Sequence, residues 1–397
     1  MKRPLVILSI GLLLSGLSLR AGTPESIHID FYGTAIELPV TFTSPVSFAK
    51  PISAASIKEF YSQLSNTNYD PVIGSLEGYR AENKPDDWLF YQLIRKTAQE
   101  ISPKVENYPR YTLYKWFLLN KLGYDAILST DGEKLLMYVR SDDEIYDIPF
   151  RMKDGKKYAC LNYHDYGYNI DFSKSVFEEV AVAASREKML FSYKLDHLPE
   201  FRPEHYREKD IRFSYAGNDY GFKVKVNEEV KKIFANYPVT DYRWHFNIPM
   251  SNETYKSLIP QLKEDLKGKS VKSGVSFLMH FTRYSFEYKT DKENFGTEKR
   301  LSPEQTLLYE GSDCEDRVAL FFYLVKEIYN LPMIVMTYPD HVSIAVAFER
   351  PVGTPVMYNG KAYSVCEPTP QRKDLPIGRM EKGRVNTPYE VSFVYSP

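Results

Sequence analysis

The chain has 397 residues, of which 43% are hydrophobic, 15% aromatic and 26% charged. Its 51 Lys and Arg residues nearly balance its 52 Asp and Glu residues, so it has no basic field that could hold a polyanion, which excludes nucleic-acid binding by phosphate neutralisation. A chain of this length favours two domains, each with its own core. The three cysteines are too few for a disulfide scaffold and lack the close pairing of a zinc site.

The first 21 residues have the pattern of a secretory signal peptide. Lys2 and Arg3 precede an apolar run over residues 5–17, and Ala21-Gly22 offers a cleavage site of small residues. No later stretch reaches the roughly 18 apolar residues that a membrane-spanning helix needs. We therefore expect an exported protein, periplasmic or secreted, with no integral membrane span after signal removal; an uncleaved N-terminal anchor is the alternative.

Hydrophobic periodicity predicts a similar series of elements in two stretches of the chain. In the first stretch, strands are expected at residues 27–32 and 35–38, helices at 53–64, 86–101 and 111–122, and strands at 125–129, 134–139, 146–150 and 157–162. In the second, a strand is expected at 220–226, helices after Ser251, at 271–284 and at 313–329, and strands at 333–338, 341–348, 355–358, 362–367 and 390–395. Helices followed by antiparallel strands predict an α+β fold rather than a doubly wound parallel sheet.

The spacing of matching residues in the two stretches predicts an internal duplication. Arg110 and Leu113 lie 207 residues before Arg317 and Leu320. A helix near residues 176–189 and a polar, Pro-bearing segment separate the two stretches. We therefore expect an N-terminal unit at residues 22–175, a connector at 176–210 and a C-terminal unit at 211–397. Two unrelated α+β domains with a similar order of elements are the alternative.

One group of residues has the composition of a thiol active site. Residues 311–316, Gly-Ser-Asp-Cys-Glu-Asp, begin an apolar helix and place Cys314 in its first turn, where unpaired amide groups and the helix dipole stabilise a thiolate. The neighbouring Glu315 and Asp316 oppose this effect. A nucleophilic thiol also needs a base, and the base needs a group that orients it.

A histidine and a glutamate on later strands could supply these two groups. Strand alternation places His341 on one face with Ser343 and Ala345, whose small side chains leave room for the helix that carries Cys314. Glu367 ends a later strand, and Cys366 should point to the opposite face. A buried structural Cys and a structural His are the alternatives, and a disulfide between Cys314 and Cys366 is conceivable in an oxidising compartment.

The region at about residues 270–370 resembles the transglutaminase-like superfamily. The family pattern is Gly-x-Cys-x-Asp, then His, then Asp-Pro-Thr; residues 311–316 match its first part with one additional residue, His341 matches the second, and Glu367 stands where Asp is usual. The resemblance implies a helix with a nucleophilic Cys packed on an antiparallel sheet that carries a His and an acid. It implies that Cys314, His341 and Glu367 are catalytic.

At the same spacing, the first stretch has Asn107 in place of Cys314, Lys134 in place of His341 and Asn162 in place of Glu367. None of these residues can perform thiol chemistry. We therefore expect the N-terminal unit to be a degenerate copy with a structural or substrate-binding role.

The sequence thus predicts an amide-processing thiol enzyme, a cysteine peptidase or a transamidase, that uses no metal and no cofactor. Its substrate would be a peptide, a protein or a glycopeptide, and its substrate-binding residues do not follow from the pattern. The alternative is a catalytically inactive member of the same fold that binds peptide or glycan. Catalysis requires the sulfur of Cys314 near one ring nitrogen of His341 and the carboxylate of Glu367 on the other, whereas a binding module does not.

Overall fold

The computed structural model describes residues 26–40, 44–49, 51–182 and 189–397. The predicted signal peptide lies outside these residues. The chain contains 35% helix and 25% strand, with antiparallel sheets, which confirms the predicted α+β class. Among the described helices, none combines the length and the apolar character needed to cross a bilayer.

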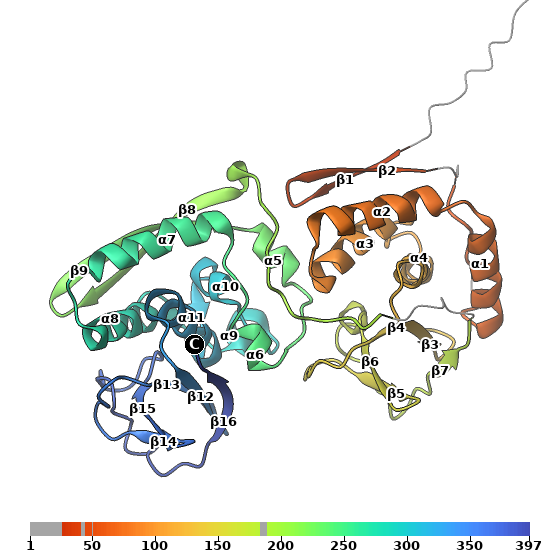
Figure 1. Ribbon diagram of the computed structural model, residues 1–397. Coiled ribbons are helices and arrows are strands. Elements are labelled where there is room, and N and C mark those ends of the chain that lie inside the picture. The colour runs from red at the N-terminus through yellow and green to blue at the C-terminus, as the bar shows by residue number, and fades with distance from the viewer. Residues whose placement is uncertain (1–25, 41–43, 50, 183–188) are drawn as a thin grey trace, which may run out of the picture.

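The first half of the chain consists of a hairpin, a layer of helices and an antiparallel sheet (Figure 1). The hairpin packs on the helices, and the sheet has the strand order β5-β6-β4-β3-β7. The elements are β1 (Ser26–Phe31), β2 (Thr34–Pro39), α1 (Ala54–Asn66), α2 (Asp70–Asn83), α3 (Asp87–Ile101), α4 (Tyr108–Lys121), β3 (Ala126–Thr130), β4 (Leu135–Arg140), β5 (Phe150–Lys153), β6 (Lys156–Cys160), a 3-10 turn (Tyr163–Tyr166) and β7 (Glu178–Val180).

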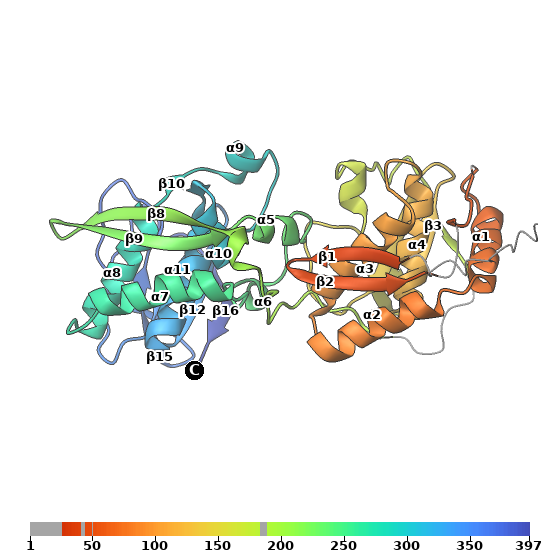
Figure 2. The same ribbon diagram turned by 90° about the horizontal axis from the view of Figure 1, so that it is seen from above.

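The second half also begins with a hairpin, which lies along α7, and ends with a five-stranded antiparallel sheet of order β14-β15-β13-β12-β16 (Figure 2). A short 3-10 turn (Pro203–His205) precedes it. The elements are β8 (Tyr206–Tyr215), β9 (Asn218–Asn227), α5 (Glu229–Ile233), α6 (Tyr242–His245), α7 (Asn252–Asp265), α8 (Val271–Tyr284), β10 (Glu287–Tyr288), α9 (Asp291–Phe295), α10 (Pro303–Leu308), β11 (Gly311–Ser312), α11 (Cys314–Tyr329), β12 (Met333–Tyr338), β13 (His341–Val346), β14 (Val356–Tyr358), β15 (Lys361–Cys366) and β16 (Glu390–Tyr395).

The two five-stranded sheets have the same order of strands. In each, the first two strands in chain order form the central hairpin, the fourth strand joins the second, and the fifth joins the first. The registers also agree: Val139 pairs with Ala126 in one sheet, and Val346 pairs with Met333 in the other. Each sheet follows a buried helix: α4 packs on β3 and β4, and α11 packs on β13.

The core of the second half lies between α11 and one face of its sheet. The apolar side chains of α11, such as Val318 and Phe322, are fully buried in one cluster with Val342 and Ile344 of β13. The other face of the sheet carries a smaller cluster that includes Ala345. Because α11 is fixed along its length by this packing, its first turn is held at the start of β13.

The structure corrects two predicted elements. Residues 146–149 are not a strand, and only Phe150 of the predicted segment belongs to one (β5), because the backbone before it pairs with the other half of the chain: Ile145 bridges Thr240, and the N–H of Tyr146 donates to the carbonyl of Val239 at 3.0 Å. The predicted helix near residues 176–189 is also wrong where the chain is described, because β7 covers the open edge of β3. Residues 183–188 lie outside the described part.

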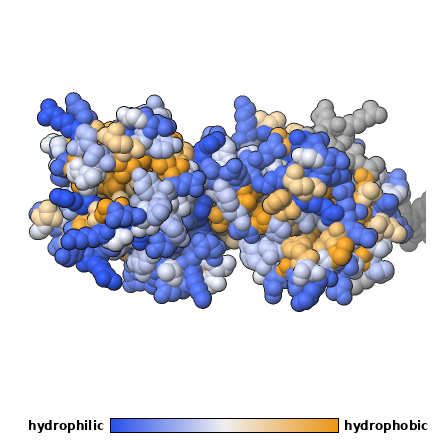
Figure 3. Space-filling view, turned by 90° about the horizontal axis from the view of Figure 1, so that it is seen from below, coloured by the Kyte–Doolittle hydropathy of each residue, from blue (hydrophilic) through white to orange (hydrophobic). Residues whose placement is uncertain are grey.

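The surface is mostly hydrophilic, and the two halves form separate lobes with hydrophobic patches on each (Figure 3). Exposed apolar side chains occur on the outer strands of both sheets, with Phe150 at 59% exposure and Met152 at 58% on β5, and Met357 at 62% on β14. The predicted boundaries of the units, 22–175, 176–210 and 211–397, remain a prediction, although β8 begins inside the predicted connector.

Candidate functional site

The first turn of α11 is fixed by a reciprocal cap. The carboxylate of Asp313 accepts the backbone N–H groups of Glu315 at 3.0 Å and Asp316 at 3.4 Å, and the Asp316 carboxylate accepts the N–H of Asp313 at 3.2 Å. Cys314 is the first residue of the helix and is partly buried. The Asp-Cys-Glu-Asp sequence therefore places the thiol at the helix N-terminus, as predicted.

His341 and Glu367 form the predicted pair of an imidazole and an orienting carboxylate. His341 Nε2 lies 2.9 Å from Glu367 Oε2, and both residues are buried. The other carboxylate oxygen accepts the N–H of Thr369 at 3.0 Å, and the guanidinium of Arg283 donates to the backbone carbonyl of Glu367. Glu367 is thus held from two sides, and its hydrogen bond fixes the imidazole so that Nδ1 is the nitrogen left for a further partner.

Cys314, the first residue of α11, lies next to the start of β13 and therefore beside this pair. The backbone N–H of Val342, the residue after His341, donates toward the sulfur of Cys314, and the carboxylate of Glu367 is close enough to act on the thiol electrostatically. The helix and the strand are in direct contact. The structure therefore brings the three predicted residues into one neighbourhood.

The environment of the thiol disfavours its charged form. Burial, followed by the nearby carboxylates of Asp313 and Glu315, raises the pKa of Cys314 to about 12, and only the N–H of Val342 acts in the opposite direction. The acidic neighbours that the sequence indicated thus add to the effect of burial on the pKa. The resting thiol is neutral at pH 7.

The face of β13 that meets α11 differs from the predicted one. Alternation is confirmed, but the helix packs on the face of Val342 and Ile344, whereas Ala345 lies in the smaller cluster with Tyr338, the residue that pairs with His341. Large aliphatic side chains bury more apolar area against the helix than small ones, which decides the face. His341 lies near Cys314 only because it is the first residue of β13, where the first turn of α11 is held.

All three cysteines lie in the described part and are free. Cys366 is buried in the main core, opposite the side chain of Glu367, as predicted, and burial raises the pKa of its thiol well above the ordinary value. Cys160 is buried as well, and burial raises its pKa to about 12. The Cys314–Cys366 disulfide considered from the sequence is therefore absent, and the two buried thiols are structural.

Three carboxylates converge behind the thiol, which sequence reasoning missed. Asp291, Asp313 and Asp316 each offer an oxygen, and these oxygens lie within 4.8 Å of one another. Burial, with repulsion from Asp313, raises the pKa of Asp291 to about 7, and burial with repulsion from Glu315 raises that of Asp313 to about 6. Such a group could hold a cation or share protons. Asp291 lies in the segment whose resemblance to the family was noted, but its contact with α11 required the structure.

Backbone groups already hold two of these carboxylates. The N–H of Lys299 donates to Asp291 at 2.6 Å, and the N–H of Leu301 donates to Asp316 at 2.8 Å. These bonds attach the loop before α10 to the start of α9 and to the first turn of α11. The cluster therefore has a structural role in positioning the residues around Cys314, whatever else it binds.

The start of α4 in the first half corresponds to the start of α11, but it carries different functional groups. Asn107 is the N-cap of α4, the position that Asp313 has in α11, so Tyr108 and not Asn107 is the counterpart of Cys314. Asn162 donates to the Tyr108 hydroxyl at 2.8 Å, and Lys134 lies 3.7 Å from Asp131. A tyrosine–asparagine hydrogen bond thus stands where the second half has a thiol and a carboxylate.

Replacing Asn162 by Ala should destabilise the protein by about 2 kcal/mol, because its buried amide also accepts the N–H of Met137 at 2.8 Å and donates to the carbonyl of Leu135 at 2.9 Å. Urea unfolding followed by circular dichroism would measure the loss. Asn218→Ala, at the exposed start of β9, is the control and should change stability little. Equal effects of the two substitutions would contradict a structural role for Asn162.

Comparison with known proteins finds no family model that matches the chain and no similar curated protein or solved structure.

Proposed function

We propose that the protein is an exported, thiol-dependent amide-processing enzyme whose second half is transglutaminase-like. The observation that carries the proposal is the hydrogen bond between His341 Nε2 and Glu367 Oε2 at 2.9 Å, beside the helix N-terminus that bears Cys314. A thiol, an imidazole and an orienting carboxylate are the groups that acyl transfer through a thioester requires.

In this proposal the sulfur of Cys314 attacks the carbonyl carbon of an amide. His341 accepts the thiol proton at Nδ1 and later donates it to the leaving amine, while Glu367 holds the ring in orientation. The backbone N–H of Cys314 would help to bind the oxyanion. Because burial raises the pKa of the thiol to about 12, the proton must be taken during the attack rather than beforehand.

The substrate would be a peptide, a protein or a glycopeptide, and hydrolysis is the simplest reaction for an exported enzyme. We further propose that the chain is an internal duplication whose first unit has lost the thiol site. The common strand order and register of the two sheets support this, as does the presence of Lys134 and Asn162 at the matching positions.

The alternative is a catalytically inactive module that binds peptide or glycan. The raised pKa of Cys314 favours it, because a neutral, largely buried thiol is a weak nucleophile without help from a base. The two proposals differ in whether the reactivity of Cys314 depends on His341.

The test is the rate of alkylation of Cys314 by iodoacetamide between pH 5 and 10, followed by mass spectrometry of its peptide. If His341 acts as the base, His341→Ala should slow the reaction at pH 7 by roughly 100-fold, and Glu367→Gln should slow it less. His197→Ala, whose side chain is 75% exposed, is the matched control and should have no effect. Cys314→Ala sets the background from the two buried thiols. A thiol whose reactivity is indifferent to both partner substitutions would refute the enzyme and leave the binding module.

A further inference from the structure

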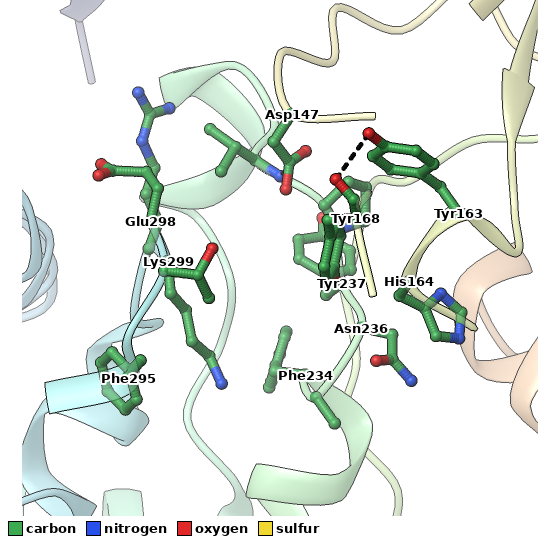
Figure 4. Close-up of a pocket in the computed structure, with 15 residues that line it drawn as sticks. Asp147, Tyr163, His164, Tyr168, Phe234, Asn236, Tyr237, Phe295, Glu298 and Lys299 are labelled. Carbon is green, nitrogen blue, oxygen red and sulfur yellow. Dashed lines mark hydrogen bonds between the residues drawn. The ribbon is translucent and has the colours of Figure 1, made fainter. Parts of the chain in front are cut away.

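A cleft of about 480 Å³ lies between the two halves of the chain (Figure 4). Its volume is within the range of about 300 to 1,000 Å³ that is usual for ligand sites. One wall belongs to the first half and two belong to the second. The lining residues are Asp147, Tyr163, His164 and Tyr168, then residues 234–239, and then Phe295 with residues 297–300.

The walls are held together by backbone contacts across the two halves. The N–H of Val239 donates to Asp147 Oδ1 at 2.8 Å, and the carbonyl of Val239 accepts the N–H of Tyr146 at 3.0 Å. Farther along the same segment, the indole N–H of Trp88 donates to the carbonyl of Ile233 at 2.9 Å. The cleft is therefore built into the structure and does not depend on a ligand for its shape.

Most of the apolar side chains in the lining are aromatic, and the others are the smaller Ala235, Pro238 and Val239. Among the described residues that line the cleft there is no Leu, Ile or Met; the rings come from three separate segments and belong to Tyr163, Tyr168, Phe234, Tyr237 and Phe295. The large aliphatic side chains that would suit a lipid chain or an apolar peptide are thus missing from the described lining. Flat rings beside hydrogen-bonding groups suit a ligand with an apolar face and a polar edge.

The charges of the lining cancel. Asp147 and Glu298 carry negative charge, Lys299 and Arg300 carry positive charge, and burial lowers the pKa of His164 so that this side chain is neutral at pH 7. A cleft with no net charge does not attract a polyanion or a polycation. The balance favours a neutral ligand with many hydroxyl or amide groups.

We propose that this cleft binds a neutral saccharide chain. Each sugar ring has an apolar face of C–H groups that stacks on Tyr168, which is 40% exposed, and a hydroxyl edge that reaches the carboxylate of Asp147 and the amide of Asn236. In Figure 4 these side chains lie around one space, with Lys299 on the opposite wall.

The cleft is connected to the thiol site by one ion pair. Arg300 in its lining donates to Glu315 at 2.7 Å, and Glu315 follows Cys314 in the sequence. The binding itself does not rest on the proposed function, because it uses no thiol.

The test is isothermal titration of the mature protein with two soluble neutral probes, the β-linked tetramers of N-acetylglucosamine and of glucose. At least one should bind with a dissociation constant below about 1 mM. Tyr168→Asn removes the ring, and Asn tolerates the backbone φ of 55° at this position, so binding should weaken at least about tenfold without loss of folding. Asp147→Asn keeps an acceptor for the N–H of Val239 and should also weaken binding.

Two controls separate this site from the thiol chemistry. Tyr284→Ala removes a ring that is 42% exposed and does not line the cleft, and it should leave binding unchanged. Cys314→Ala should also bind normally, so a failure of the enzyme proposal would not affect this result. The saccharide site is overturned if neither probe binds at about 10 mM, a concentration far above the expected dissociation constant, or if Tyr168→Asn binds as the wild type does.

Discussion

Replacing Arg317 by Met is expected to destabilise the protein by about 4 kcal/mol, since it removes a buried charge that many backbone groups depend on. The guanidinium is fully buried and donates to four carbonyls: those of Thr282 at 3.1 Å, Arg283 at 2.7 Å, Phe286 at 2.9 Å and Ser312 at 3.4 Å. Burial lowers the pKa of Arg317 to about 10, so it remains charged at pH 7. Without it, the carbonyls at the end of α8 and before α11 lose their donors.

The prediction is checked by urea unfolding of Arg317→Met beside Arg317→Lys and Arg212→Met. Lysine keeps the charge but lacks the planar guanidinium group with its several N–H donors, so it should recover only part of the stability. Arg212 has a side chain that is 79% exposed, and its replacement should cost less than about 0.5 kcal/mol. A loss below about 1 kcal/mol for Arg317→Met, no more than a single ordinary hydrogen bond contributes, would show that the four hydrogen bonds are not important for folding.

Arg317 also shows that matching positions in the two halves do not predict matching side-chain contacts. The spacing pairs it with Arg110, yet Arg110 is only partly buried and donates to the hydroxyl of Ser102 at 2.8 Å and to Glu106 at 3.1 Å. The two arginines occupy the same turn of matching helices, α4 and α11, but one binds side chains and the other binds backbone carbonyls. A shared position in the sequence therefore predicts the helix and not the contacts.

Elements with strong periodicity could be predicted from the sequence. The bounds of β12 and β16 were predicted to the residue, and α1 begins after its predicted cap, Ser53. The helix α2 was missed, because Gly74 and Gly78 weaken its helical pattern and it buries only a narrow stripe that includes Val72. The hairpin strand β8 was missed because its polar alternation resembles a connector.

The sequence predicts which residues form the candidate site better than it predicts their protonation and reactivity. The helix start and the strand ends were enough to predict the pairing of His341 with Glu367. The raised pKa of Cys314 and the cluster around Asp291 depend on burial and on distances between segments far apart in the sequence. The cleft between the halves could not be predicted at all, because the pattern predicts a strand over residues 146–150, whereas residues 146–149 make the contact with Val239 instead.

The stability of the protein should fall as the pH rises from about 4 to 7 through Asp291, opposite to the usual behaviour of a carboxylate. The folded-state pKa of Asp291 is about 7, raised from 3.8 by burial and by the nearby Asp313. The folded state therefore binds a proton that the unfolded state releases, and the stabilisation is complete below about pH 4 and lost as the pH passes 7. The shift corresponds to about 4 kcal/mol.

Asp291→Asn tests this linkage, because asparagine keeps an oxygen that can accept the N–H of Lys299 and cannot ionise. The variant should match the wild type near pH 4 and exceed it by up to about 4 kcal/mol at pH 8, as measured by urea unfolding at each pH. Asp142→Asn, at an exposed position, is the control and should follow the wild type throughout. If the wild type and Asp291→Asn show the same pH dependence, the three carboxylates behind Cys314 do not share a proton in the folded state, and their repulsion is relieved in another way, such as by a bound cation.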